Sequence, residues 1–154
     1  MRERDYTPAI YGSLLVTTLI AVQSRLNATP EFIALSLVLS VAVFWLTHAW
    51  SAFVNERVHG PVGWAEVVRF GVAESPMLAA TVIPAGLLAL ARMDFYSVDV
   101  AVNVALAVSL VQLFLWGLAV GRRAHTSWLL AVAVALVDFA LGLVIVVLKL
   151  TALH

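Results

Sequence analysis

An aspartate stands in the middle of an apolar stretch near the C-terminal end of the chain. Asp138 lies about 11 residues into the stretch 127–150, in which Lys149 is the only other charged residue. An ionised side chain in hydrocarbon costs at least about 2.5–3.5 kcal/mol. A helix formed by this stretch would therefore turn Asp138 toward protein or water, where a carboxyl group can hold and pass a proton.

Four further polar residues lie in or beside apolar stretches: His48, Glu74, Asn103 and Gln112. If these stretches cross a membrane in alternating directions, His48, Glu74 and Gln112 fall in the same half of it. We predict that these three side chains and Asp138 approach one another around an inward-opening polar cavity, with Asn103 on the opposite face of its helix. The alternative is that they only form hydrogen bonds between helices, worth about 0.6 kcal/mol each on average.

The histidines and carboxylates give little support to a metal or haem site. The chain has no cysteine and four histidines, of which only His48 lies well inside an apolar stretch, so a second haem ligand at matching depth is lacking. Glu56 and His59 form one Glu-x-x-His pair, whereas di-iron bundles use two. Glu56, His59 and Glu66 are the nearest approach to a metal site, and we expect neither a metal nor another cofactor.

Catalytic motifs do not accompany these residues. The sequence has no His-Glu-x-x-His zinc pair and no Gly-rich phosphate loop. We therefore expect no enzymatic activity. Nine Lys+Arg balance nine Asp+Glu to a net charge of +0, which leaves no basic field to attract a nucleic acid.

The composition indicates that membrane helices position these side chains. The 154 residues are 63% hydrophobic and 12% charged, whereas soluble domains are about 45–50% apolar and about 25% charged. Such a chain has too little charge to cover a surface that faces water. The lipid bilayer is therefore its expected solvent.

The apolar stretches have the length of membrane spans. Because a helix rises about 1.5 Å per residue and the hydrocarbon core is about 30 Å thick, about 17–25 apolar residues make one crossing. We predict five spans, over residues 8–23, 32–54, 76–91, 97–120 and 127–150. The short links between them predict one all-α domain over 1–154, a polytopic membrane helix bundle.

Three charged residues interrupt the apolar region that follows the second span: Glu66, Arg69 and Glu74. Ser75 followed by Pro76 is typical of an N-cap and a first helical residue. We therefore predict an interfacial helix over 62–73 before the third span. A single long tilted helix would also fit this region.

The basic residues predict the orientation of the chain. With five spans, six of the nine basic residues fall on the side of the N-terminus: Arg2, Arg4, Arg57, Arg69, Arg122 and Arg123. Arg25, Arg92 and Lys149 fall on or near the other side. Because short cytoplasmic loops carry an excess of Lys and Arg, we predict a multi-pass protein of the inner (plasma) membrane, with the N-terminus cytoplasmic and the C-terminus outside.

Small residues and a proline predict how the helices pack. Gly117 and Gly121 form a GxxxG step that allows close approach of another helix. Gly142 shares one helical stripe with Asp138 and two alanines, so this stripe should face protein. Pro84 removes the backbone hydrogen bond to residue 80 and is expected to kink its helix.

Three segments, in the order FWLTHAW, ESP and GRRAHTSW, resemble a group of small bacterial multi-helix integral membrane proteins. The resemblance spans most of the chain. It implies a membrane-embedded helical protein and implies no activity.

These observations favour a small channel or proton-coupled transporter with Asp138 at its centre. Because five short helices enclose little volume, we expect a homo-oligomer that forms the pathway between protomers. The alternative is a non-transporting accessory subunit or assembly scaffold that pairs with a membrane partner protein. A third possibility is a lipid or a small apolar ligand in a groove beside the Pro84 kink.

Overall fold

The computed structural model describes residues 6–26, 28–91, 96–124 and 127–151, and within these ranges every regular element is an α-helix. The helices are α1 (Thr7–Arg25), α2 (Pro30–His59), α3 (Trp64–Ala73), α4 (Pro76–Leu90), α5 (Val98–Arg123) and α6 (Trp128–Thr151). The predicted all-α class is therefore confirmed for the described part of the chain.

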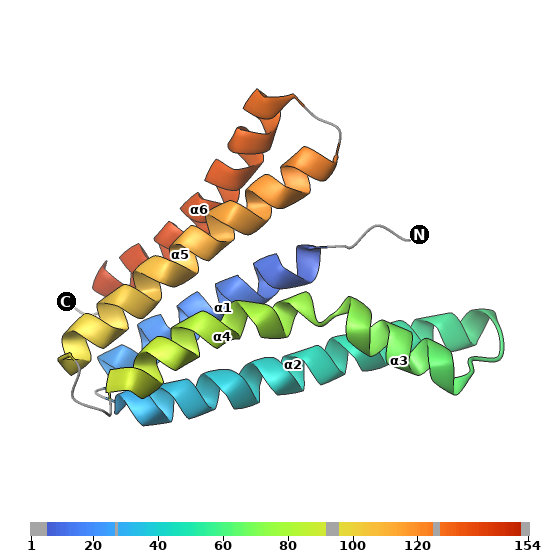
Figure 1. The fold of residues 1–154 in the computed structure, drawn as a ribbon, viewed down its shortest axis with the longest axis horizontal. Coiled ribbons are helices and arrows are strands. Elements are labelled where there is room, and N and C mark those ends of the chain that lie inside the picture. Colours follow the sequence, from blue (N-terminus) through green and yellow to red (C-terminus); the bar gives the residue numbers. More distant parts are fainter. Residues whose placement is uncertain (1–5, 27, 92–95, 125–126, 152–154) are drawn as a thin grey trace.

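The first helix is central to the packing, because α1 contacts α2, α4, α5 and α6. The antiparallel helices α5 and α6 pack on each other on one side of α1, while α2 and α4 pack on the other (Figure 1). The two pairs lie close together where α5 begins and diverge toward the end of α5, with the start of α1 between them (Figure 1).

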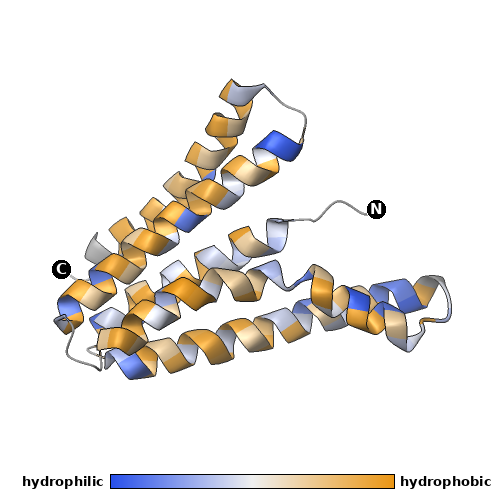
Figure 2. Cartoon of the chain, viewed as in Figure 1, coloured by the Kyte–Doolittle hydropathy of each residue, from blue (hydrophilic) through white to orange (hydrophobic). Residues whose placement is uncertain are grey.

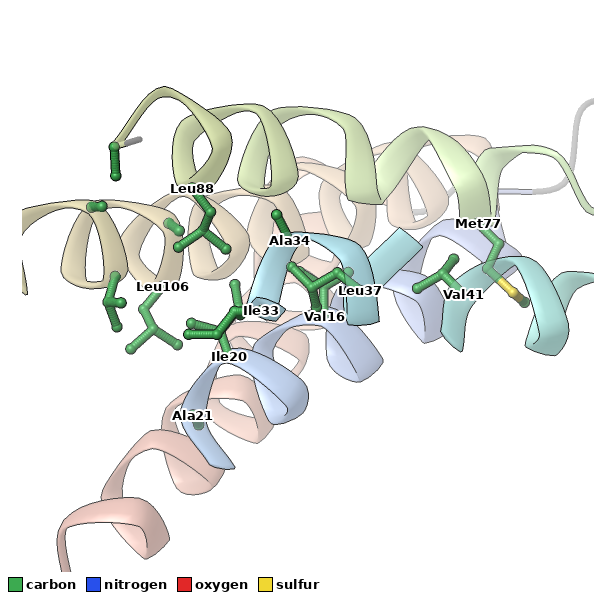
Figure 3. Packing of buried hydrophobic residues seen from close by; sticks show 14 residues of the cluster. Val16, Ile20, Ala21, Ile33, Ala34, Leu37, Val41, Met77, Leu88 and Leu106 are labelled. Carbon is green, nitrogen blue, oxygen red and sulfur yellow. The ribbon is translucent and has the colours of Figure 1, made fainter. Parts of the chain in front are cut away.

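The largest buried side chains gather where α1, α2, α4 and α5 meet (Figure 3). Val16, Ile20, Ile33, Leu37 and Leu88 are fully buried there. At the contact of α1 with α4, a Cβ added to Gly12 would lie only 2.6 Å from the backbone oxygen of Met77. The two backbones therefore approach closely, a contact that the sequence analysis missed.

The helices are long and apolar enough for a membrane-embedded multi-pass protein. Four of them, α1, α2, α5 and α6, meet the length and hydropathy expected of a span, and α3 with α4 meets them only as a pair bent by 46°. With its 15 residues, α4 is about 22 Å long, less than the hydrocarbon core. Hydrophobic residues cover the helix bodies, and hydrophilic ones gather mainly near helix ends (Figure 2).

Helix boundaries differ from the predicted spans mainly at α2. This helix has 30 residues and ends at His59 rather than at residue 54, because polar residues beyond the apolar stretch continue the helix. Thr29 caps α2 by accepting from the amide of Phe32. Ser75 was expected to cap α4, but it keeps helical backbone angles and its hydroxyl donates to Val72 O at 2.7 Å. The chain therefore bends at Glu74 and Ser75 without a side-chain cap.

Candidate functional site

The glycines of α5 hold it against α6, as the sequence predicted. A Cβ on Gly121 would lie 2.7 Å from Cα of Ala131, and one on Gly117 would lie 2.9 Å from Cα of Ala135. A Cβ on Gly142 would lie 2.5 Å from Cδ1 of Leu113, at the end of a flexible side chain of α5. The small-residue stripe of α6 thus faces α5, and at Gly117 and Gly121 a side chain would meet the backbone of α6.

Asp138 lies on this stripe, next to Gly117. A Cβ added to Gly117 would clash with the carboxylate oxygen Oδ2 of Asp138. This oxygen is buried and has no hydrogen-bond partner among the described residues. Since Asp138 is 10 residues after Trp128, it lies about 15 Å along α6, near the middle of a span. A buried acceptor without a partner at this depth is costly unless it is protonated or hydrated.

A row of polar side chains lies between α1 and α5. Thr17 Oγ1 of α1 is 2.9 Å from Ser109 Oγ of α5, and both residues are fully buried. Ser13 lies one turn from Thr17 on the same face of α1, and Gln112 lies one turn from Ser109 on α5. Gln112 was among the predicted site residues, but nothing in the sequence indicated the register of α5 with α1.

Aromatic and charged side chains lie at the end of this row where α1 begins and α5 ends. The rings of Tyr6 and Trp116 lie 5.4 Å apart. Arg123 Nη2 donates to Tyr6 Oη at 2.8 Å, and the guanidinium lies over the tyrosine ring. Because these contacts join the start of α1 to the end of α5, they set the two helices antiparallel. We refer to Ser13, Thr17, Ser109, Gln112 and Trp116 as the α1–α5 seam.

His48 and Glu74 form a second polar group, on α2 and at the bend between α3 and α4. His48 Nδ1 lies 3.7 Å from Glu74 Oε2, and their side chains are 36% and 20% exposed. The imidazole also packs against Phe44 and Tyr11. These two side chains were predicted to approach each other. Nearby, Trp45 Nε1 donates to Gly71 O at 2.9 Å and ties α3 to α2.

Of the four side chains expected around one polar cavity, the structure brings His48 and Glu74 together. Gln112 lies in the contact of α5 with α1, and Asp138 lies against Gly117 of α5. His48 and Glu74 come from the helices on the other side of α1 (Figure 1). The sequence predicts how deep each side chain lies in the membrane. Side chains at similar depth can still face different helices, as they do here. Asn103 is exposed on the surface of α5.

Pro84 is buried inside α4, which continues as a helix on both sides of it. A 46° bend lies at the junction of α3 with α4, at Glu74 and Ser75. An apolar groove of 290 Å³ runs between α2 and α4 and is lined by Val38, Val41, Ala42, Leu78, Thr81, Val82 and Ala85. It lies in the region where the sequence analysis considered a lipid groove.

The residues considered for a metal site have other surroundings. Glu66 Oε2 accepts from the amide of Gly63 at 2.9 Å at the start of α3, and Glu56 is exposed. The side chain of His59 lies outside the described residues. Among the side chains that the structure describes, no three His, Cys, Asp or Glu residues gather closely enough to hold a metal ion.

No protein-family model matches the chain, and neither a curated protein nor a solved structure resembles it closely enough to match.

Proposed function

We propose that the protein is a small channel or proton-coupled transporter of the inner membrane, with Asp138 as the group that binds and releases the proton. The observation that carries this proposal is the buried Asp138 Oδ2 without a partner, beside Gly117 near the middle of α6. Hydrocarbon does not stabilise an ionised carboxylate, so such residues in membrane proteins mark ion and proton paths. Its position between protein helices fits a group that water reaches.

We further propose that the chain crosses the membrane five times. The bent α3–α4 pair then supplies the third crossing, with α4 in the hydrocarbon layer and α3 at the interface. Among the described arginines, Arg57, Arg122 and Arg123 lie near the ends of α2 and α5, and Arg69 lies on the short helix α3 that follows α2. This distribution supports a cytoplasmic N-terminus and an outer C-terminus. The His48–Glu74 pair would then belong to the inner half.

Proton flux into liposomes tests the role of Asp138. We expect the purified protein to dissipate a proton gradient, and Asp138→Asn to lower the rate by at least about tenfold because the protonatable group on the path is lost. Asp99→Asn is the matched control, since Asp99 is an exposed acid in the first turn of α5. Equal rates in empty liposomes and in liposomes with either protein would end the proposal.

An accessory or scaffold role is the second candidate, and one observation favours it. Much of α6 and the side chain of Asn103 on α5 are exposed on this single chain, which leaves faces for a second copy or for a membrane partner protein. A homo-oligomer would also allow a pathway between protomers. The mass of the protein in nanodiscs distinguishes these cases: a homo-oligomer supports the transporter, and a monomer that is purified with a larger complex supports the accessory role.

A further inference from the structure

Three polar atoms of the α1–α5 seam are buried without a hydrogen-bond partner among the described residues: Ser13 Oγ, Gln112 Oε1 and Trp116 Nε1. Ser13 is 0% exposed and Gln112 is 9% exposed. A buried polar atom without a partner costs about 1–3 kcal/mol, so native proteins provide it with a protein group or an ordered water. Three such atoms in one seam therefore indicate a shared hydrogen-bond partner that is not a protein side chain.

The order of contacts along the seam places these atoms between two fixed points. Thr17 meets Ser109 at one end, and Tyr6 stacks on Trp116 at the other. Ser13 and Gln112 lie between these contacts in an antiparallel pair of helices. From Ser109 of the seam to Arg123, which contacts Tyr6, α5 rises over 14 residues, which is about 21 Å. It thus runs from a charged helix end to about the middle of the membrane.

The donor and acceptor properties of the three atoms indicate which species can bind all of them. The amide oxygen of Gln112 only accepts a hydrogen bond, the indole nitrogen of Trp116 only donates one, and the hydroxyl of Ser13 can do both. A metal cation could not accept from Trp116, and an anion could not donate to Gln112. Water does both, and a buried water typically makes about three hydrogen bonds to groups of this kind.

We propose that the α1–α5 seam holds a chain of water molecules that leads from Tyr6 and Arg123 inward to Thr17 and Ser109. The hydroxyl pair closes the chain, because Thr17 Oγ1 contacts both Ser109 Oγ and Ser13 O, and Ser109 Oγ donates to Leu106 O. Asp138 touches α5 at Gly117, the residue after Trp116. That the water chain serves this carboxyl group rests on the proposed function, whereas the water chain itself does not.

Cysteine accessibility tests the proposal, because the natural chain contains no cysteine. Methanethiosulfonate reagents react with the thiolate, which forms only where water reaches the sulfur. Ser13→Cys changes one oxygen to sulfur in the seam. Val111→Cys is the matched control, since Val111 lies on α5 at a similar depth and is 53% exposed on the outer surface of the helices. Reactivity is measured in proteoliposomes with a charged, membrane-impermeant reagent.

We expect Ser13→Cys to react at least about tenfold faster than Val111→Cys, because only the seam thiol can ionise. Equal, slow rates in the two variants would overturn the proposal. Hydroxyl-radical footprinting of the unmodified protein in nanodiscs provides a test without substitution: radicals form from water, so Trp116 should be oxidised although its indole nitrogen is buried. Protection of Trp116 would also overturn the water chain.

The result separates the water chain from the proposed function. A reactive Ser13→Cys in a protein that passes no protons would leave the water chain standing and end the transport proposal. Flux that depends on Asp138, together with an unreactive Ser13→Cys and a protected Trp116, would support transport and place its path outside the seam.

Discussion

The absence of a side chain at Gly117 allows the carboxylate of Asp138 to lie against α5. A Cβ at this position would lie 2.9 Å from Cα of Ala135 and would overlap Asp138 Oδ2. Gly117→Ala therefore must separate α5 from α6 or displace the carboxylate, and overpacking of this kind costs about 1–3 kcal/mol. We expect the free energy of unfolding to fall by this amount, measured by reversible denaturation in detergent micelles.

Gly86→Ala is the control for this substitution. A Cβ on Gly86 would meet nothing within 4 Å, and Ala is favoured over Gly in a helix by about 0.5–1 kcal/mol. The control variant should therefore be as stable as the natural protein or slightly more so. If Gly117→Ala and Gly86→Ala have the same stability, the close approach of α5 to α6 is wrong.

At the scale of single residues, sequence reasoning succeeded where the signal lies within one helix. The period of 3.6 residues indicated that Asp138 and Gly142 face the same way, and both lie toward α5. The contact of Thr17 with Ser109 joins residues 92 positions apart. Its register depends on how two separate helices pack, so no pattern within either helix could reveal it.

At the scale of the element, α3 depends on few contacts with the rest of the molecule. None of its described side chains is buried, and Trp45 Nε1 of α2 donates to Gly71 O of α3. Trp45→Phe removes this hydrogen bond, which is worth about 0.5–1.5 kcal/mol, and retains an aromatic ring. We expect the amides of α3 to exchange hydrogen about three- to tenfold faster, measured by mass spectrometry in nanodiscs.

Trp128→Phe is the matched control for the hydrogen bond. Trp128 begins α6, is 58% exposed, and its ring lies under the guanidinium of Arg122. Its replacement should leave exchange in α3 unchanged, and exchange in α4 should stay slow in both variants. Unchanged protection of α3 in Trp45→Phe would mean that the interface with α2 does not depend on this hydrogen bond.

The sequence predicted most of the helices and part of their boundaries. Apolar length predicted every helix that meets the length and hydropathy of a span, and the Glu-Ser-Pro segment predicted the division of α3 from α4. Ser75 and Pro76 take the predicted N-cap and first helical positions of α4, but Ser75 keeps helical backbone angles and makes no capping hydrogen bond. The predicted kink at Pro84 is a separate feature and stays a prediction.

At the scale of the whole molecule, basic residues are distributed unequally between the two ends. Arg57, Arg122 and Arg123 lie at or near the ends of α2 and α5, and Arg69 lies on α3, whereas Arg25 ends α1 at the opposite end (Figure 1). Apolar burial does not set the orientation, because lipid is equally apolar in either direction. We therefore expect the charges to determine the orientation, with the arginine-rich end in the cytoplasm.

Labelling of single cysteines from each side of the membrane tests this orientation. Gly60→Cys reports the arginine-rich end, where the backbone is extended and a Cβ meets nothing within 4 Å. Leu26→Cys reports the other end, because Leu26 is 74% exposed where α1 ends. We expect an impermeant maleimide to label Leu26→Cys in right-side-out vesicles and Gly60→Cys only in inside-out vesicles. Labelling of both from one side would require an even number of crossings between them, and the reversed pattern would mean that the four arginines face outward. Either result would contradict the orientation, and the first would also remove the second crossing.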